Sequence, residues 1–317
     1  MPDEPVTLRA VSAMEEYELR DYAAGFERQH PGITVTIERR PTRALHAHLL
    51  GLGDTDEWDV LLGCSVTSVA DPAMTALLDP LDESLLDRVP PDASGAGGRW
   101  IGPSGFVPAF CIAPGAADER DVPRPTSWRD LADPRWRGAI CLPDPNVSGA
   151  GFLHLRALIE VLGHAHALQV MGEVGRNRPT VVRSAFDPCR AVLAGEAAIG
   201  VTVSTAMARL RSEGHDVGST TPSDACRYEL EAFGINRRSP HRAAAHALLA
   251  WMAGDDAAAI SASYGKVVTS RPGPADASRL APIDVEAAAT DRSRAVVAWS
   301  DAFSISTGQP HGETQPT

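Results

Sequence analysis

About the first 70 residues alternate between the hydrophobic periods of strands and of helices, and this alternation constrains the fold more than any other feature of the sequence. Strand patterns occupy Val6–Val11 and Ile33–Glu38, and Trp58–Leu62 is an apolar strand of the buried kind. Helix patterns lie between them, over about Glu15–His30 and Thr42–Leu52. Because a helix separates each strand from the next, the order predicts parallel strands joined by right-handed crossovers, and therefore an α/β fold.

The rest of the chain continues this mixture of strands and helices. A length of 317 residues suggests two domains or one large one, at roughly 100–200 residues per domain. The segment from about Asp92 to Gly105 is rich in Gly, Ser and Pro, so we predict a loop or linker there. The polar residues after about Ser304 are expected to form a disordered tail. Further strands are predicted at Phe106–Ala113, Ala197–Val203 and Leu230–Ile235, and further helices at Phe152–Gly163, Thr205–Glu213 and His241–Ala253.

The charge balance is acidic and argues against two classes of partner. The chain has 41 Asp and Glu residues against 29 Lys and Arg residues, a formal net charge of −12. Such a surface repels phosphate backbones and anionic lipids, so we expect neither nucleic-acid binding nor attachment to a membrane surface. No apolar run approaches the roughly 20 residues that span a bilayer, so no membrane insertion is expected. Lys266 is the only lysine, a skew that we interpret as a consequence of genome composition.

Recognisable catalytic and metal-binding signatures are scarce. The sequence has no Walker loop, no HExxH and no GxSxG, and Gly149-Ala-Gly151 lacks the rest of a dinucleotide-binding fingerprint. The five cysteines show neither a CxxC pair nor a spacing with histidine typical of zinc, so we interpret them as small buried thiols. We therefore predict no catalytic residue, no cofactor and no metal site, and we do not expect an enzyme.

Hydroxyl side chains follow four of the predicted strands. Ser12 comes after the first strand and Ser65 after the third. Ser148 lies between a predicted strand at Ala139–Leu142 and a helix that starts near Gly149, and Ser204 follows the strand that ends at Val203 and opens a helix. Ligands of open α/β sheets bind outside the carboxyl ends of strands, and helix N-termini attract anions. The alternative for Ser148 and Ser204 is an N-cap that serves only its own helix. The candidate ligand-binding residues in these loops are Ser12, Ser65, Ser148, Gly149, Ala150, Gly151, Thr202, Ser204 and Thr205.

A longer motif carries a resemblance to a known family. Residues 125–145, PTSWRDLADPRWRGAICLPDP, resemble the pattern P-T-W-x-D-L-x-D-P-x-W-K-G-x-I-x-x-P-D-P of bacterial periplasmic solute-binding proteins of ABC importers. The branch is the class II group, whose members bind ferric ion, 2-aminoethylphosphonate, sugar phosphates or thiamine. Gly195–Gly200, Tyr228–Ala232 and Ala247–Trp251 fit the same family, and the resemblance runs from about Leu8 to Gly273.

The resemblance implies a two-lobed α/β fold of the periplasmic-binding-protein type. Mixed sheets flanked by helices form each lobe, and two crossing strands, near Phe106–Ile112 and Tyr228–Ile235, join the lobes. Binding of a ligand then closes the lobes by a hinge motion. We expect lobe 1 to contain residues 1–105 and 233–280 and lobe 2 to contain residues 106–232 and 281–303, with residues 304–317 as the tail.

The identity of the ligand depends on residues that differ within the group. Ferric-ion binders carry two adjacent tyrosines just after the equivalent of Gly195–Gly200, where this chain has Ser204 and Thr205. Neutral hydroxyls and helix N-termini instead suit a phosphate, phosphonate or carboxylate. In the phosphonate and sugar-phosphate binders a glutamate near the cleft holds an amine or a sugar hydroxyl, and we assign this role to Glu231 rather than Glu229. The alternative for either glutamate is a surface ion pair with an arginine.

The resemblance therefore implies a solute receptor that captures a small organophosphate or phosphonate anion, such as 2-aminoethylphosphonate or a sugar phosphate. An ABC permease is its expected partner if the protein is exported, and the receptor is expected to be a monomer. A ferric-ion-binding protein of the same family, or a cytoplasmic sensor or enzyme on the same fold, stays open as an alternative. By resemblance the location is periplasmic or extracytoplasmic, but Met1–Leu8 shows no signal peptide, so the protein is cytoplasmic if Met1 is the native start.

Overall fold

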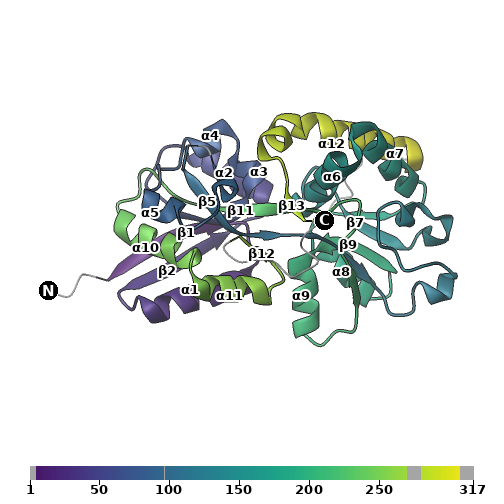
Figure 1. Ribbon diagram of the computed structural model, residues 1–317, viewed down its shortest axis with the longest axis horizontal. Coiled ribbons are helices and arrows are strands. Elements are labelled where there is room, and N and C mark those ends of the chain that lie inside the picture. The colour runs from purple at the N-terminus through teal and green to yellow at the C-terminus, as the bar shows by residue number, and fades with distance from the viewer. Residues whose placement is uncertain (1–4, 96, 270–279, 308–317) are drawn as a thin grey trace. The chain divides into compact units, whose positions relative to one another are not determined.

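The computed structural model describes residues 5–95, 97–269 and 280–307, which fold into two compact units. Unit 1 lies within residues 1–106 and 229–289, and unit 2 within residues 107–228 and 290–317 (Figure 1). The chain passes between the units after Phe106 and after Tyr228, inside the two predicted crossing segments, and a third time after Ala289. Residues 229–232 and 281–289, which the sequence assigned to lobe 2, lie in unit 1 because strands formed by residues 227–235 and 281–282 pair within its sheet.

The sheet of unit 1 confirms the predicted parallel arrangement of the N-terminal strands. Its order is β12-β5-β11-β3-β1-β2; in addition, β13 pairs with β11 and β4 pairs with β5. Strand β1 lies between β2 and β3 and is parallel to both, whereas β11 is antiparallel to β3 and β5, so the sheet is mixed. The strands are β1 (Val6–Ser12), β2 (Ile33–Arg39), β3 (Val60–Ser65), β4 (Ser94–Gly95), β5 (Trp100–Phe106), β11 (Arg227–Ile235), β12 (Val267–Val268) and β13 (Ala281–Pro282).

The helices of unit 1 include those predicted from the sequence. In α1 the side chains of Leu19, Tyr22 and Phe26 recur three or four residues apart and are buried, which explains why this segment is helical. Helix α11, which the sequence analysis missed, packs against α1 (Figure 1). The helices are α1 (Glu16–Gln29), α2 (Thr42–Leu52), α3 (Val66–Val69), α4 (Pro72–Thr75), α5 (Glu83–Leu86), α10 (Arg242–Met252) and α11 (Asp255–Ser263), with a 3-10 turn at Pro91–Ala93.

Strand β5 corrects the prediction of a loop over Asp92–Gly105. Trp100–Phe106 is a buried strand that pairs with β11, although its sequence contains two glycines and a proline. The reason is close packing: a Cβ atom on Gly105 would lie 2.6 Å from the carbonyl oxygen of Glu229 in β11. The glycines of this segment, which are typical of a loop, here allow the backbones of β5 and β11 to lie close together.

Unit 2 contains a second mixed sheet, of order β10-β6-β9-β7-β8. Strands β7, β8 and β9 are parallel and β6 is antiparallel to β9. The carboxyl ends of the three parallel strands therefore meet at one edge of this sheet. The strands are β6 (Pro108–Ile112), β7 (Ile140–Pro143), β8 (Thr180–Val182), β9 (Ile199–Val203) and β10 (Gly218–Thr220).

Helices cover the sheet of unit 2, and two tryptophans of the family motif lie in its core. Trp128 and Trp136 are 2% and 1% exposed, so this part of the motif packs the interior. The final helix continues to Thr307, which corrects the expectation of a tail from Ser304; residues 308–317 lie outside the described residues. The helices are α6 (Gly149–Leu162), α7 (His164–Gly175), α8 (Asp187–Leu193), α9 (Ser204–Ser212) and the final helix α12 (Val285–Thr307), with 3-10 turns at Asp118–Arg120, Asp130–Ala132 and Pro134–Trp136.

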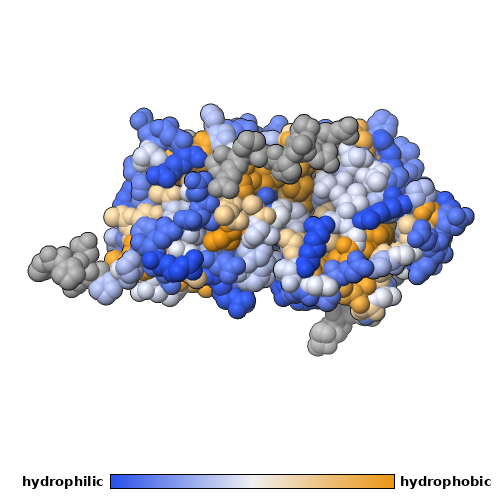
Figure 2. All heavy atoms as spheres, turned by 60° about the horizontal axis from the view of Figure 1, so that its bottom comes forward, coloured by the Kyte–Doolittle hydropathy of each residue, from blue (hydrophilic) through white to orange (hydrophobic). Residues whose placement is uncertain are grey.

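The described surface is mainly hydrophilic. The face drawn in Figure 2 carries many blue side chains, with hydrophobic residues in separate orange patches. Among the described residues, the large hydrophobic side chains with substantial exposure are Leu50, Val181, Leu193 and Val297. None of the helices in the described ranges has the length and hydrophobicity required to cross a membrane.

Candidate functional site

Ser12, at the end of β1, forms hydrogen bonds inside unit 1. Its hydroxyl donates to the carbonyl oxygen of Leu62 at 2.6 Å and accepts a hydrogen bond from the backbone N–H of Met14 at 3.0 Å. The side chain is fully buried. Because a hydroxyl has a single hydrogen and Ser12 donates it to the backbone, this residue fixes the loop between β1 and α1.

Ser65, at the end of β3, belongs to a buried cluster with Glu229. The hydroxyl of Ser65 donates to Oε1 of Glu229, and the hydroxyl of Thr67 donates to the same oxygen at 2.5 Å. The backbone N–H of Thr67 adds a third contact at 3.3 Å. Glu229 is fully buried, so the alternative of a surface ion pair with arginine is wrong for this glutamate.

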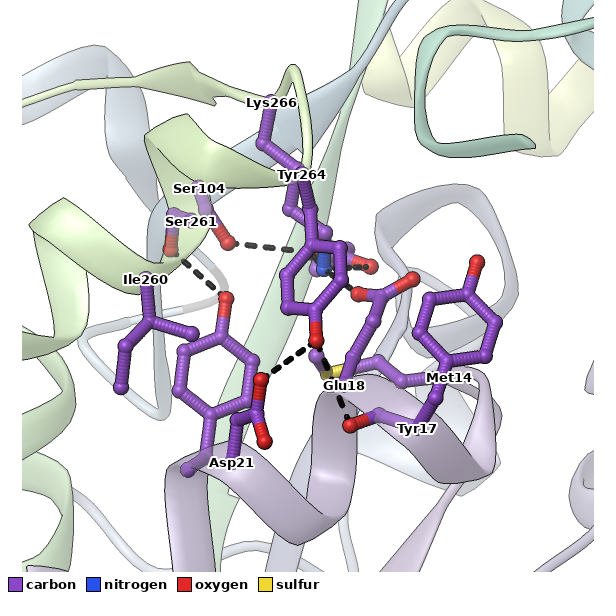
Figure 3. A network of polar contacts seen from close by, with 12 residues as sticks. Met14, Tyr17, Glu18, Asp21, Ser104, Ile260, Ser261, Tyr264 and Lys266 are labelled. Atoms are coloured by element: carbon purple, nitrogen blue, oxygen red, sulfur yellow. Dashed lines mark hydrogen bonds and ion pairs between the residues drawn. The ribbon is translucent and has the colours of Figure 1, made fainter. Parts of the chain in front are cut away.

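Glu231 is also buried, and its partner is a lysine. The ammonium nitrogen Nζ of Lys266 lies 2.7 Å and 3.0 Å from the two carboxylate oxygens of Glu231. Ser104 of β5 donates a hydrogen bond to the same carboxylate at 2.9 Å. Lys266 also forms an ion pair with Glu18, which rises toward it from α1 (Figure 3). The surface-arginine alternative is therefore wrong for Glu231 as well.

The buried position of these groups shifts their pKa values. Burial raises the pKa of Glu18 to about 7, although the Lys266 ammonium acts in the opposite direction. Burial lowers the pKa of Lys266, but Glu18 and Glu231 together outweigh this effect and raise it well above its ordinary value. Lys266 is therefore an ammonium ion at neutral pH, and it holds two carboxylates in place.

Two tyrosines that the sequence analysis did not single out lie beside this network. Tyr17, in the first turn of α1, and Tyr264, after α11, have ring centroids 5.4 Å apart. The Tyr264 hydroxyl donates to Asp21 at 2.5 Å (Figure 3). Burial raises the pKa of Tyr264, and Asp21 raises it further, so this hydroxyl stays protonated. In the sequence Tyr17 was indistinguishable from the apolar repeat of its helix.

In unit 2 the loop after β7 presents backbone donors at the start of α6. Ser148 is the N-cap of this helix and accepts a hydrogen bond from the N–H of Gly151 at 3.3 Å. The N–H groups of Gly149 and Ala150 donate to no residue in the described ranges, nor does the Ser148 hydroxyl. A Cβ atom on Gly151 would lie 2.6 Å from the carbonyl oxygen of Pro143, so only glycine fits this contact.

The loop after β9 presents hydroxyls at the start of α9. Ser204 is the first residue of the helix and not its N-cap, and its Oγ accepts a hydrogen bond from the N–H of Val107 at 3.2 Å. Within the described part of the chain, neither Ser204 nor Thr205 donates its hydroxyl hydrogen. Thr202 is fully buried and donates to the carbonyl oxygen of Ala185 at 2.7 Å, so its hydroxyl supports the loop after β8.

His154, which the sequence analysis missed, connects α6 to β9. Its Nε2 lies 2.7 Å from the carbonyl oxygen of Thr202, and its Nδ1 accepts a hydrogen bond from the indole N–H of Trp128 at 3.2 Å. Since the carbonyl can only accept and the indole can only donate, the ring is neutral with its hydrogen on Nε2. Burial lowers the pKa of His154 to about 4, which agrees with this assignment.

Arg183 adds a positive charge to the same edge of unit 2. It follows the last residue of β8, it is exposed, and it makes no hydrogen bond or ion pair within the described ranges. Because β7, β8 and β9 are parallel, Arg183 shares an edge with the N-termini of α6 and α9. Arg183 was not predicted as a site residue because the three-residue strand before it was not predicted either.

The described residues contain few groups suited to a metal ion. No group of three or more His, Cys, Asp or Glu side chains in the described ranges could hold one. All five cysteines are free; Cys64, Cys111, Cys141 and Cys189 are buried and Cys226 is half-buried, which agrees with their interpretation as small thiols.

Several solved structures share this fold. The iron-bound HitA of Pseudomonas aeruginosa has a TM-score of 0.79 at 21% identity, over 94% of this chain and 99% of that one. The periplasmic binding protein AfuA of Actinobacillus pleuropneumoniae, with exogenous fructose 6-phosphate bound, has a TM-score of 0.81 at 17% identity, over 95% and 99%. The apo ferric ion-binding protein A of Pasteurella haemolytica has a TM-score of 0.77 at 18% identity, over 94% and 98%. These similarities confirm the predicted class of fold.

Sequence comparison gives the family. An uncharacterized protein of Haemophilus influenzae is 29% identical over 111 residues, which are 35% of this chain and 32% of that protein, so this chain spans about a third of its length. Residues 59–299 match the bacterial extracellular solute-binding proteins. Because these residues make up most of the chain, the protein belongs to the family of bacterial extracellular solute-binding proteins.

Proposed function

We propose that this solute-binding protein is the receptor for a small organophosphate or phosphonate anion, such as a sugar phosphate or 2-aminoethylphosphonate. The observation that carries the proposal is the edge of unit 2, where free N–H groups of Gly149 and Ala150, undonated hydroxyls and Arg183 occur together. The similar protein AfuA, solved with fructose 6-phosphate, supports this class of ligand.

The electrostatics of this edge suit an anion. The N-terminus of a helix carries a partial positive charge and unpaired N–H groups, and α6 and α9 both begin here. Arg183 contributes a full charge, and a guanidinium binds two phosphate oxygens through parallel hydrogen bonds. Ser148, Gly149, Ala150, Ser204 and Thr205 would bind the anionic group, while Gly151, Thr202 and His154 would position them.

Unit 1 contributes differently to the proposed receptor. Ser12 and Ser65 donate their hydrogens inside the unit and serve as supports for its loops. Glu231 is paired with Lys266, so we propose a supporting role for it as well. Binding shifts the units toward a closed arrangement, and the receptor then delivers its solute to an ABC permease outside the cytoplasm.

Ferric ion is the alternative that the similar protein HitA keeps open. A hard trivalent cation requires anionic oxygen ligands, whereas Ser204 and Thr205 are neutral alcohols. Arg183 at the same edge would repel a cation. Because Asp144 follows β7 at the same edge, it is the unpaired donors and Arg183, rather than the net charge, that favour an anion.

Calorimetric titration with fructose 6-phosphate, 2-aminoethylphosphonate, inorganic phosphate and ferric citrate tests the proposal. We expect binding of at least one phosphate or phosphonate, and a thermal stabilisation of about 2.7 kcal/mol at a concentration 100 times the Kd. Arg183→Ala should weaken this binding roughly tenfold to a hundredfold, because hydrogen bonds to charged groups contribute about 1.5–3 kcal/mol.

Arg211→Ala is the matched control. Arg211 is exposed and lies in the last turn of α9, away from the start of that helix, so its removal should leave the affinity unchanged. Heat with ferric citrate alone, or equal affinities for the Arg183→Ala protein and the parent, would contradict the proposal.

A further inference from the structure

The only lysine of the chain is buried in unit 1 among carboxylates. The other 28 of the 29 Lys and Arg residues in the sequence are arginines. The Lys266 side chain is 0% exposed, and the side chains of its partners Glu18 and Glu231 are 3% and 8% exposed. A chain that otherwise uses arginine for positive charge thus keeps one lysine, at a place where the charged group is enclosed by the protein.

The charges of this cluster do not balance when all three groups are ionised. Two carboxylates and one ammonium sum to one negative charge, and an uncompensated charge in a dry interior is strongly disfavoured. One additional proton removes the imbalance. The proton therefore has an electrostatic reason to be held inside the folded unit.

Among the described residues, the titratable groups next to the cluster are acidic or neutral, and the nearby Arg39 is already paired with Glu15 at 3.0 Å. On α1 the neighbouring titratable groups are Glu15, Asp21 and Tyr22, and Tyr264 follows α11. Glu229 precedes Glu231 by two residues on β11, and strand alternation puts both on one face. None of these five groups carries a positive charge, and the carboxylate of Glu15 adds to the raised pKa of Glu18.

The hydrogen bonds identify which carboxylate holds the proton. Glu231 receives two contacts from Lys266 and one from Ser104, all of which stabilise its ionised form. The carboxylate of Glu18 forms an ion pair with Lys266 but receives no additional hydrogen bond from the described residues. The anion is therefore better stabilised on Glu231, and protonation is easier on Glu18. The raised pKa of Glu18, about 7, agrees with this assignment.

We propose that Glu18, Lys266 and Glu231 form a proton-binding site in unit 1, in which Glu18 holds the proton and Lys266 remains an ammonium ion. Release of the proton near neutral pH leaves the cluster with one negative charge. The ion pairs of Lys266 join α1 to β11, so the charge of the connection between these two elements depends on pH. The site is independent of which solute the receptor binds.

Nuclear magnetic resonance on the full chain tests this site directly, because a single lysine gives a single Nζ resonance. The protein is labelled with ¹⁵N at lysine Nζ and titrated from about pH 5 to about pH 9. This range lies above the ordinary pKa of Glu and below the ordinary pKa of Lys. We expect Lys266 to stay an ammonium ion throughout and its resonance to shift in one step near neutral pH. Absence of the step, or loss of the ammonium proton in this range, would overturn the proposal.

Two variants assign the step to Glu18. Glu18→Gln should abolish the step in the Lys266 resonance. The control Glu16→Gln, which removes an exposed carboxylate two residues away on the same helix, should leave the step in place. A step that persists in Glu18→Gln overturns the assignment. If Glu18→Gln does not fold, ¹³C labelling of the glutamate carboxyl carbons in the parent protein decides: one carboxyl titrating near pH 7 supports the site, and titration of all of them below about pH 5 overturns it.

Discussion

Units 1 and 2 both place serines at the ends of strands, but the two units use these serines differently. In unit 1 the hydroxyl hydrogens of Ser12 and Ser65 are donated to a carbonyl and a carboxylate of the same unit. In unit 2 the hydroxyls of Ser148 and Ser204 accept hydrogen bonds but donate none to the described residues. The difference teaches that a serine after a strand is a candidate ligand only where its hydrogen is not already donated.

One buried group in each unit makes the stability of the fold depend on pH, and the two dependences have opposite signs. Glu18 of unit 1 has a folded-state pKa of about 7 against an ordinary 4.5, so the folded state binds the extra proton and loses stability as pH rises between these values. His154 of unit 2 has a folded-state pKa of about 4 against an ordinary 6.5. Here the unfolded state binds the extra proton, so stability is lost as pH falls through this window.

The largest effect is expected for Lys266→Met in unit 1. Removing the ammonium leaves the buried Glu231 carboxylate beside Glu18 without its cation, which should lower the free energy of unfolding by about 3–5 kcal/mol. Urea unfolding followed by tryptophan fluorescence measures this loss. Adding Glu18→Gln should restore part of it, because position 18 can then no longer place a second negative charge beside Glu231 when its proton is lost. A loss below about 1 kcal/mol would mean that water reaches the cluster.

In unit 2, His154→Leu should cost about 2–3 kcal/mol at pH 7, because the carbonyl of Thr202 and the indole N–H of Trp128 are left buried without partners. Urea unfolding at pH 7 and at pH 5 gives the check. The difference between variant and parent should be smaller at pH 5, where the parent has already lost part of the stability of a neutral histidine. A constant difference would show that His154 does not titrate as its burial implies.

Gly105→Ala and Gly151→Ala disturb a similar close backbone contact, the first in unit 1 and the second in unit 2. In each case the new Cβ would lie 2.6 Å from a carbonyl oxygen, of Glu229 in unit 1 and of Pro143 in unit 2. Each substitution should cost about 1–3 kcal/mol of stability. Only Gly151→Ala should also weaken the binding of a phosphate or phosphonate, since it displaces the start of α6. Calorimetry separates the two, and equal effects on affinity would remove the distinction between the units.

Single hydroxyls provide a further comparison of the two units. Ser148→Ala and Ser204→Ala should each weaken anion binding by roughly 1–3 kcal/mol, the contribution of a hydrogen bond to a charged ligand. Ser12→Ala should leave the affinity unchanged and lower stability by about 1–2 kcal/mol, because Met14 loses its acceptor. Affinities measured by calorimetry at matched ionic strength test both statements. Weaker binding in Ser12→Ala would place unit 1 hydroxyls in direct contact with the anion.

The sequence alone predicted the fold better than the site. The alternation of strands and helices up to β3 gave the parallel arrangement, because hydrophobic periodicity is local information. Strand β5 was missed because Gly102, Pro103 and Gly105 are typical of loops, and their close packing against β11 depends on residues more than 100 positions away. Helix α11 and the final helix were missed as well, since their apolar residues give weak periodicity.

The site could be predicted only in part, for a physical reason. Ser12 and Ser204 look alike in the sequence, but the hydrogen of Ser12 is donated to Leu62, 50 residues away. Such long-range hydrogen bonds leave no local pattern. Lys266 stands out in the sequence as the only lysine, but genome composition was enough to explain why lysine is so rare. Its role becomes visible only in the structure, where it lies between two buried carboxylates.

The central claim is that the start of α6 and α9 in unit 2 binds the anionic group of the solute. Backbone amide resonances observed during titration with fructose 6-phosphate and with 2-aminoethylphosphonate test it most directly. We expect the amide resonances of Gly149, Ala150 and Thr205 to shift with the bound fraction of at least one of these solutes. If a solute binds and these three amides keep their resonance positions, the assignment of the anion to unit 2 is wrong.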